Sequence, residues 1–420
     1  MDSFVLKGNF IYSKTPAELA VYPGGYGVCV DGVCAGVFEE LPACYAHLPV
    51  RDYGDSLIVP GLVDLHIHAP QYTFRGSGMD LELMDWLQQQ PFPEEARFQD
   101  TAYARQAYRL FARQMRESAT TRAVIFATRH GQATRILMEE MEKTGLYSFV
   151  GKVNMDQNAP ENLVEESAEI SLRDTLNWLE EAGDMERTKP ILTPRFIPAC
   201  SRELLEGLGQ IRRERNLPVQ SHLSENPGEI AAVHRLFPEE KTYGHCYERY
   251  GLMEGAIMAH CVYSEEAEVA LLKEKGAFVA HCPASNTNLS SGIAPIRRYL
   301  RQGLQVGLGS DVAGGHSESI FRAMADAIGV SKLYWRLVDD ESKPLSLPEA
   351  FYLGTRGGGA FFGKVGSFEE GFAFDALVLD EGAMPRWREM SLLQRLEQFV
   401  YLEQGRASLK AKYAGGRQIF

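Results

Sequence analysis

The chain has 420 residues, of which 45% are hydrophobic, which is enough for one large domain with a substantial core and a smaller second domain. The formal net charge is −13 and no long run of Lys or Arg occurs, which argues against binding to the nucleic-acid backbone. No segment reaches the roughly 18 consecutive apolar residues of a membrane span, so we expect no membrane partner.

The cysteines indicate a reducing compartment. There are seven of them, an odd number scattered along the chain, and none forms a Cys-x-x-Cys pair. The N-terminus does not resemble a signal peptide. We therefore expect free thiols and a cytoplasmic protein.

Short apolar runs broken by Gly and Asp predict β-strands near both ends of the chain. These runs cover residues 4–6, 27–30, 33–37, 374–379 and 398–402. Asp31-Gly32 has the composition of a tight hairpin turn. We predict that residues 1–57 and 366–420 pair into one small β-sandwich that brackets the central domain.

Residues 58–365 alternate strand-like runs with helical patterns, which is typical of an α/β fold with a parallel sheet. The expected strands are 58–68, 123–127, 148–153, 191–196, 218–222, 256–260, 277–281 and 305–311. The expected helices include 98–118, 134–144, 164–181, 202–216, 265–275 and 319–337. Eight alternating units predict a TIM-type (β/α)8 barrel, in which functional side chains stand at the C-terminal ends of the strands.

Polar residues capable of chemistry occur where several of these strands end. They are His66, His68, Arg195, His222, His260, His281 and Asp311. Because the C-terminal ends of barrel strands surround one mouth, we expect these side chains to lie close together.

His66 and His68 are spaced i, i+2, so on a strand both imidazoles face the same side. Alone, the pair would also fit two polar residues at the end of an edge strand. With His222 and Asp311 it makes three imidazoles and a carboxylate, a set suited to one divalent metal with an open position for water. Such a metal, zinc by preference although the ligands also accept iron, lowers the pKa of bound water to roughly 7 and supplies hydroxide.

Each of these residues also has a structural interpretation. Read singly, His222 fits a hydrogen-bonded core histidine and Asp311 a helix N-cap. Glu225 is placed to shuttle protons beside the metal, or to precede the helix that begins near Pro227. His260 fits a fifth ligand or, as we favour, a group that orients the metal-bound hydroxide. For His281, a structural hydrogen bond and a catalytic task are equally compatible with the sequence.

Together these motifs resemble the amidohydrolase superfamily, and the likeness runs through the whole chain. It rests on residues 60–68, His222, His260 and Ser310-Asp311. Binuclear members carry a bridging lysine at the end of strand four, where this chain has Thr193-Pro194-Arg195-Phe196. The resemblance therefore implies one metal per chain, bound by His66, His68, His222 and Asp311.

Within that superfamily the chain resembles the guanine deaminases. The similar motifs are residues 68–72, 85–87, 92–98, 194–196, 221–226, 281–286 and 309–315. The resemblance implies hydrolytic deamination of a small purine, guanine, to xanthine and ammonia by a metal-bound hydroxide. Ser310 stands where some relatives have Thr, a departure that leaves the presumed ligands unchanged.

The resemblance also assigns roles around the substrate. Gln71 and Arg195 would hold the polar edge of the ring, and Phe196 would supply a stacking wall or belong to the barrel core. Glu225 would protonate a ring nitrogen while Asp311 takes the proton of the water. The implied substrate contacts are His68, Gln71, Arg195, Phe196, His222, Glu225 and Asp311, and the implied catalytic residues are Glu225, Asp311 and His260.

Three points stay open at the level of sequence. The same metal chemistry would serve a pterin, 8-oxoguanine or a chlorinated triazine. A non-catalytic scaffold with the same fold is the alternative from another class, and it would bind no stoichiometric metal. Relatives are commonly homodimers, which we expect here, although residues 319–337 could form an interface helix or a solvent-facing one.

Overall fold

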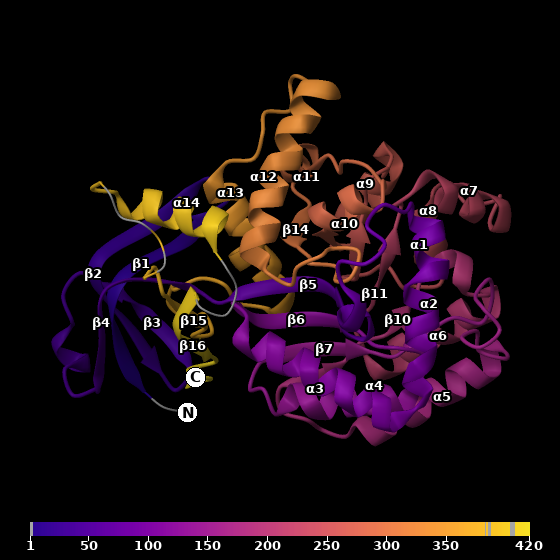
Figure 1. The fold of residues 1–420 in the computed structure, drawn as a ribbon, viewed down its shortest axis with the longest axis horizontal. Helices are drawn as coiled ribbons and strands as arrows, with labels where there is room; N and C mark the ends of the chain where they lie inside the picture. The colour runs from indigo at the N-terminus through magenta and orange to yellow at the C-terminus, as the bar shows by residue number, and fades with distance from the viewer. Residues whose placement is uncertain (1–2, 383, 385–387, 404–407) are drawn as a thin grey trace.

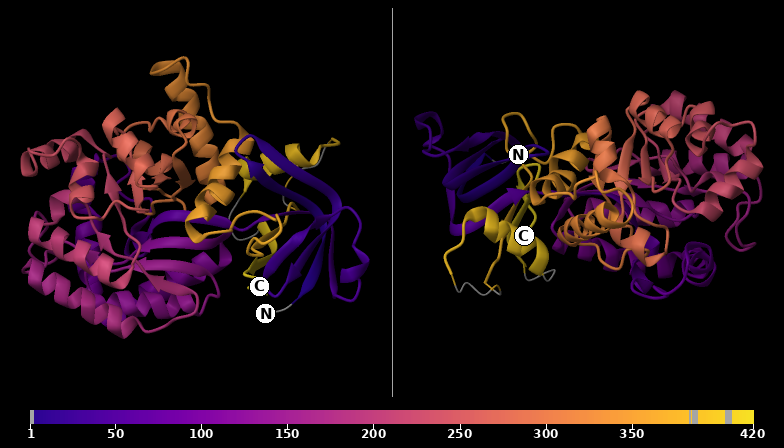
Figure 2. Two further views of the ribbon diagram at one scale, coloured as in Figure 1. Left: turned by 180° about the vertical axis from the view of Figure 1, so that it is seen from behind. Right: turned by 90° about the horizontal axis from the view of Figure 1, so that it is seen from above.

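The structure, a computed structural model, describes residues 3–382, 384, 388–403 and 408–420. Its elements form two parts, a smaller β-sheet unit that contains both ends of the chain and a larger α/β unit in which helices surround parallel strands (Figure 1). The two units lie side by side in the views from behind and from above (Figure 2).

The smaller unit contains one hydrogen-bonded sheet of seven strands in the order β17-β16-β15-β4-β1-β2-β3. These strands are β1 (Phe4–Thr15), β2 (Glu18–Val30), β3 (Val33–Phe38), β4 (Val50–Pro60), β15 (Ala376–Leu379), β16 (Leu409–Ala414) and β17 (Arg417–Gln418). The two ends of the chain meet where β15 pairs antiparallel with β4. Asp31 and Gly32 have φ angles of 49° and 84°, so the β2–β3 hairpin closes with the expected tight turn.

The predicted strand at residues 398–402 is wrong, because these residues end helix α14 (Leu392–Leu402). Ser391 and Gln394 form a capping box that starts the helix. Leu396, Phe399 and Val400 are buried, and their spacing follows the helical repeat of 3.6 residues rather than the alternation of a strand. The aromatic and β-branched composition of 398–402 had favoured a strand.

The larger unit contains strands that are all paired in parallel. They are β5 (Leu62–His68), β6 (Thr120–Phe126), β7 (Tyr147–Gly151), β8 (Val153–Asn154), β9 (Thr188–Pro190), β10 (Thr193–Pro194), β11 (Gln220–Leu223), β12 (Ile257–His260), β13 (Phe278–His281) and β14 (Gln305–Leu308). A bridge between Leu192 and Val219 joins the two halves. On the other side, Asp311 N–H donates to the His66 carbonyl at 2.8 Å and His68 N–H donates to the Val312 carbonyl at 3.1 Å. The strands therefore close into a ring.

Helices cover the outside of this ring. They are α3 (Thr101–Glu117), α4 (Gly131–Glu142), α5 (Ala168–Ala182), α6 (Arg202–Arg215), α7 (Pro227–Leu236), α8 (Tyr243–Arg249), α9 (Glu266–Glu274), α10 (Pro283–Asn288), α11 (Ile296–Gln302), α12 (Ile320–Leu337) and α13 (Leu347–Tyr352). The six predicted helices are confirmed to within four residues at each end. Side chains of Asp100, Ser167, Ser201 and Ser319 accept backbone N–H groups at four of the N-termini, as N-caps do.

Shorter helical segments complete the fold. Two of them, α1 (Leu83–Gln89) and α2 (Pro91–Ala96), lie over the ring in Figure 1. The remaining turns are η1 (Ala43–Tyr45), η2 (Ala69–Phe74), η3 (Arg97–Gln99), η4 (Ile197–Ala199), η5 (Leu353–Gly357) and η6 (Ala360–Phe362). Among the described residues, no helix is both long and apolar enough to cross a membrane. The cysteines are present as thiols and not as disulfides.

The two units are joined at Gly61, between β4 and β5. The apolar run expected as one strand is divided there, so Ile58 to Pro60 belong to the sheet of the smaller unit. A Cβ atom at Gly61 would lie 2.1 Å from Thr121 Oγ1, which leaves room only for glycine. The chain thus passes from one unit to the other three residues later than the predicted boundary at residue 57.

A buried lysine fastens the sheet to the outer helices. Lys412 of β16 is fully buried, and its ammonium donates to the carbonyls of Met115, Arg116 and Ser118 at 3.0, 3.1 and 2.8 Å. These carbonyls stand at the C-terminal end of α3, where the helix dipole favours a cation. One side chain therefore satisfies three carbonyl groups at the boundary between the two units.

We predict that Lys412→Met lowers the free energy of unfolding by about 2–4 kcal/mol, because it leaves buried carbonyls without donors. Denaturant unfolding measures this difference. Lys410→Met, the same change at an exposed position of the same strand, should cost less than about 0.5 kcal/mol. Equal effects of the two substitutions would contradict the role given to Lys412.

Candidate active site

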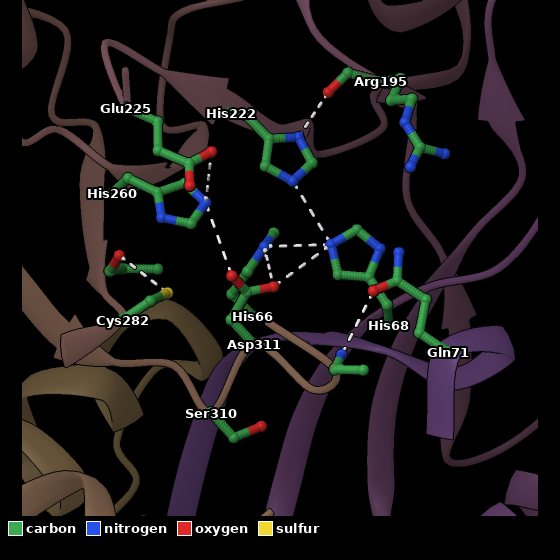
Figure 3. A network of polar contacts seen from close by, with 12 residues as sticks. His66, His68, Gln71, Arg195, His222, Glu225, His260, Cys282, Ser310 and Asp311 are labelled. Carbon is green, nitrogen blue, oxygen red and sulfur yellow. Dashed lines mark hydrogen bonds and ion pairs between the residues drawn. The ribbon is translucent and has the colours of Figure 1, made fainter. Parts of the chain in front are cut away.

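Five of the residues expected at strand ends meet at one end of the ring (Figure 3). His66 and His68 come from β5, and His222 and His260 from β11 and β12. Asp311 follows β14 and is held beside β5 by its backbone hydrogen bond to His66. These five side chains therefore lie close together at the C-terminal ends of the strands, as the sequence predicts.

The nitrogens of three histidines face one another around a common point. The Nε2 atom of His68 lies 3.3 Å from Nε2 of His66 and 3.3 Å from Nε2 of His222. Asp311 Oδ1 lies 3.2 Å from His66 Nε2 and 3.4 Å from His68 Nε2. Ligand atoms about 2.0–2.1 Å from a tetrahedral zinc ion are about 3.3–3.4 Å apart. The spacing of these four donors therefore fits one metal ion at their centre.

The protonation of the cluster also suits a metal. Burial lowers the pKa values of His66, His68 and His222, so the imidazoles stay neutral and keep a lone pair for a cation. Burial opposes the ionisation of Asp311, but the surrounding histidines lower its pKa overall. His222 Nδ1 lies 2.6 Å from the Arg195 carbonyl oxygen, an arrangement that places its proton on Nδ1 and turns Nε2 toward the cluster.

A carboxylate that the sequence did not single out secures Asp311. Asp64 is fully buried in β5 and accepts hydrogen bonds from the Ser310 hydroxyl at 2.5 Å, from Ser310 N–H at 3.0 Å and from His66 N–H at 3.1 Å. Asp311 itself has a φ of 46°, a left-handed conformation that non-glycine residues adopt only under constraint. Ser310, noted as a departure from relatives, thus supplies the contact that holds this constraint.

Glu225 and His260 form a second pair on one side of the histidines (Figure 3). His260 Nε2 lies 3.4 Å from Glu225 Oε2 and 3.7 Å from Asp311 Oδ2. The other ring nitrogen, Nδ1, lies 2.9 Å from the Asn286 side-chain oxygen. Burial opposes the charge of His260, but Glu225 and Asp311 raise its pKa. His260 Nε2 therefore faces two carboxylates while Asn286 fixes the ring.

Glu225 is a buried carboxyl group. Burial raises its pKa to about 7, which allows it to gain and lose a proton near neutral pH. Ser291 donates to its Oε1 at 2.9 Å. The N-cap of α7 is Asn226, which forms a capping box with Glu229. Glu225 does precede this helix, as the structural interpretation had it, but Asn226 caps the helix while the Glu225 carboxyl group binds Ser291 and faces His260.

Gln71 and Arg195 stand on the opposite side of the histidines (Figure 3). Both are almost fully buried and both donate to Glu95, a residue of α2. Arg195 binds the two carboxylate oxygens of Glu95 at 2.5 and 3.1 Å, and Gln71 donates to Oε1 at 2.9 Å. Residues 92–98 contribute to the family resemblance, but no pattern in the sequence indicates a role for Glu95, because its partner Arg195 lies 100 positions away.

A cleft lies between these two sides. Its polar lining comprises His68, Gln71, Arg195, His222, Glu225, Glu229, His260 and Asp311. Its apolar lining comprises Leu83, Trp86, Leu87, Phe196 and Leu289. Phe196 both lines the cleft and packs in a core cluster, so the two interpretations of this residue are compatible. The cleft has the mixed lining of a small-molecule site.

His281 does not line this cleft. It is buried at the end of β13, and burial lowers its pKa to about 3. Neither ring nitrogen has a hydrogen-bond partner among the residues that the structure describes. The structure thus shows neither the structural hydrogen bond nor the catalytic contact considered for His281.

Comparison with known proteins gives a consistent result. The model of the amidohydrolase family matches residues 57–410. Guanine deaminase from Rattus norvegicus is 38% identical over 99% of this chain and 96% of its own length. Guanine deaminase from Dictyostelium discoideum is 36% identical over 99% of this chain and 98% of its own.

A solved structure agrees over the complete fold. Guanine deaminase from C. acetobutylicum, with guanine bound in its active site, superposes with a TM-score of 0.96, 42% sequence identity and full coverage of both chains. The chain therefore belongs to the amidohydrolase family and, within it, to the guanine deaminases.

Proposed function

We propose that this protein hydrolyses guanine to xanthine and ammonia. The observation that supports this most directly is a cleft with a metal-ligand set and a titratable carboxyl on one side and paired hydrogen-bond donors for a polar ring edge on the other. The relatives at 36–42% identity are guanine deaminases. We also interpret the closed ring of parallel strands and outer helices as a (β/α)8 barrel.

We propose that His66, His68, His222 and Asp311 bind one divalent metal, zinc or iron. Three neutral imidazoles and one carboxylate suit either ion, and the donor spacing of 3.2–3.4 Å supports a single shared ligand point. Such an ion supplies Lewis acidity and makes a bound water acidic near neutral pH. A ring nitrogen of His260 lies within 4.8 Å of those of His66 and His222, but its Nε2 faces Asp311 and Glu225, so we assign it the role of orienting these two carboxylates rather than that of a ligand.

Proton transfer then falls to the two carboxylates that face His260. Asp311, which is ionised, accepts a proton from the attacking water. Glu225, whose pKa is about 7, delivers a proton to the ring nitrogen beside the carbon under attack. The carbon at position 2 becomes tetrahedral and carries both a hydroxyl and the amino group. Asp311 passes its proton to the amino nitrogen, Glu225 regains a proton from the hydroxyl as the carbonyl forms, and the bond to the amino nitrogen breaks with release of ammonia. His260 keeps both carboxylates within 3.7 Å of one imidazole nitrogen.

Arg195 and Gln71 hold the substrate on the other side of the cleft. The guanidinium of Arg195 retains donors beyond the two that bind Glu95, and a fixed planar fork suits a carbonyl oxygen of the ring. Phe196 offers an apolar wall beside them. Three predictions from the sequence remain predictions: a separate domain formed by residues 1–57 and 366–420, a homodimer, and a cytoplasmic location. Light scattering coupled to gel filtration would test the homodimer.

The function is tested by mixing guanine with purified protein of known metal content and measuring the loss of guanine and the release of ammonia. We expect the ultraviolet spectrum of guanine to change to that of xanthine with one ammonia released per guanine. Adenine, cytosine, a pterin and 8-oxoguanine serve as parallel substrates. Turnover of one of these in place of guanine would keep the hydrolytic chemistry and refute the assignment of Gln71 and Arg195 as guanine-holding groups.

Replacing Glu225 by Gln should lower kcat by at least about 10²-fold, because the amide cannot transfer a proton. Metal content should stay at the wild-type value, since Glu225 is outside the proposed ligand set. Steady-state kinetics and elemental analysis of the same sample measure both quantities. Loss of the metal together with activity would show that Glu225 has a structural role instead.

Removing the metal by dialysis against a chelator should abolish guanine turnover. It should also lower the unfolding temperature, by about 5 °C or more, because a ligand bound only to the native state stabilises it. Activity and thermal stability should return together when one equivalent of zinc or iron is added. Full activity of protein shown to hold no metal would refute the proposal and would leave the convergent histidines unexplained.

A further inference from the structure

A buried carboxylate stands behind the substrate-holding edge of the cleft. Glu95 is 1% exposed, Gln71 2% and Arg195 3%. Glu95 accepts three hydrogen bonds, two from the Arg195 guanidinium and one from the Gln71 amide. Arg195 and Gln71 are the proposed substrate-binding residues, whereas Glu95 has no role in the proposed reaction.

These contacts fix the orientation of both partners. Gln71 donates to Glu95 through Nε2 and accepts from Ala313 N–H through Oε1 at 3.2 Å, so its amide cannot be flipped without losing both bonds. The Arg195 guanidinium is bound at its edge by Glu95 and packs with its carbon Cζ 5.1 Å from the ring centre of Phe92. Phe92 and Glu95 are three residues apart on α2. One short helix thus positions the guanidinium from two directions.

The pairing also fixes the charge of this edge. A guanidinium has five N–H donors, and among the described residues only Glu95 accepts hydrogen bonds from this one. Donors therefore remain for a ligand in the cleft, which Arg195 lines. The positive charge, however, is already matched by a carboxylate at hydrogen-bond distance. An unmatched buried arginine would instead attract an anion.

We propose that Glu95 is a positioning residue that sets the charge selectivity of the cleft. Because Glu95 neutralises Arg195, the hydrogen-bond donors of Arg195 and Gln71 bind a neutral oxopurine in preference to a purine anion. This inference rests on the proposed function, since it concerns the same cleft. The carboxylate on α2 thereby lowers the affinity that the buried Arg195 would otherwise have for an anionic purine.

The test compares the binding of two oxopurines to metal-loaded enzyme at a mildly alkaline pH, where xanthine is largely a monoanion and hypoxanthine is largely neutral. Calorimetric titration gives the ratio of their affinities. In Glu95→Gln we expect this ratio to shift toward xanthine by about tenfold, because Arg195 loses its counter-charge. The KM for guanine should rise by about tenfold while kcat stays within about threefold, since the amide nitrogen that replaces Oε2 cannot accept the hydrogen bond of Arg195 Nη1.

Glu94→Gln is the matched control. Glu94 is the preceding residue of α2 and accepts from Thr73 at 2.7 Å and from Tyr103, away from the cleft lining. The control should keep the wild-type affinity ratio and the wild-type KM. An equal shift in Glu94→Gln would overturn the proposal by attributing the effect to a loosened helix.

Glu95→Asp separates charge from geometry, and it keeps the test decisive if Glu95→Gln does not fold. It should retain the wild-type affinity ratio, since the charge is kept, and raise the KM for guanine, since the shorter side chain cannot span Arg195 and Gln71. An unchanged ratio in Glu95→Gln, or a shifted ratio in Glu95→Asp, would refute the inference even if guanine is the substrate. Failure of the wild-type protein to deaminate guanine would refute the function alone, because the two binding titrations do not depend on turnover.

Discussion

The closure of the strand ring between β5 and the segment after β14 is the constraint on which the site depends. The backbone bond from Asp311 to His66 and the contacts of Asp64 with Ser310 join the first and last strands. The same joint brings Asp311 within 3.2–3.4 Å of two imidazoles. The contacts that close the ring are therefore the same ones that place Asp311 among the proposed metal ligands, and they hold this residue at a positive φ.

Around that joint, buried charges are organised in pairs. Arg195 faces Glu95 on one side of the cleft, and His260 faces Glu225 and Asp311 on the other. A buried charge without a partner costs several kcal/mol, so each group is retained where a neighbour compensates it. Between these pairs lie three imidazoles that burial keeps neutral, with Nε2 of His68 3.3 Å from Nε2 of each of the other two. That arrangement is unfavourable for the protein alone and favourable for a cation.

The sequence predicts most of the parallel architecture because alternating apolar runs and helical patterns are local signals. It also locates the histidines and Asp311, since motif and strand end coincide. It misses Asp64 and Glu95, whose partners Ser310 and Arg195 are 246 and 100 positions away. No local pattern distinguishes such a carboxylate from a solvent-exposed one. The helix at 392–402 was missed for a different reason, because its composition favours a strand while its spacing favours a helix.

Helix α2 carries both groups that hold the Arg195 side chain, Phe92 against its face and Glu95 against its edge. Its neighbour α1 supplies Leu83, Trp86 and Leu87 to the cleft wall. The apolar residues of α1 that line the cleft and the residues of α2 that support Arg195 thus belong to one short segment of the chain. Any movement that lifts α2 to widen the entrance also separates Arg195 from its supports. The position of α2 and the hydrogen-bonding geometry that Arg195 offers to a ligand therefore depend on each other.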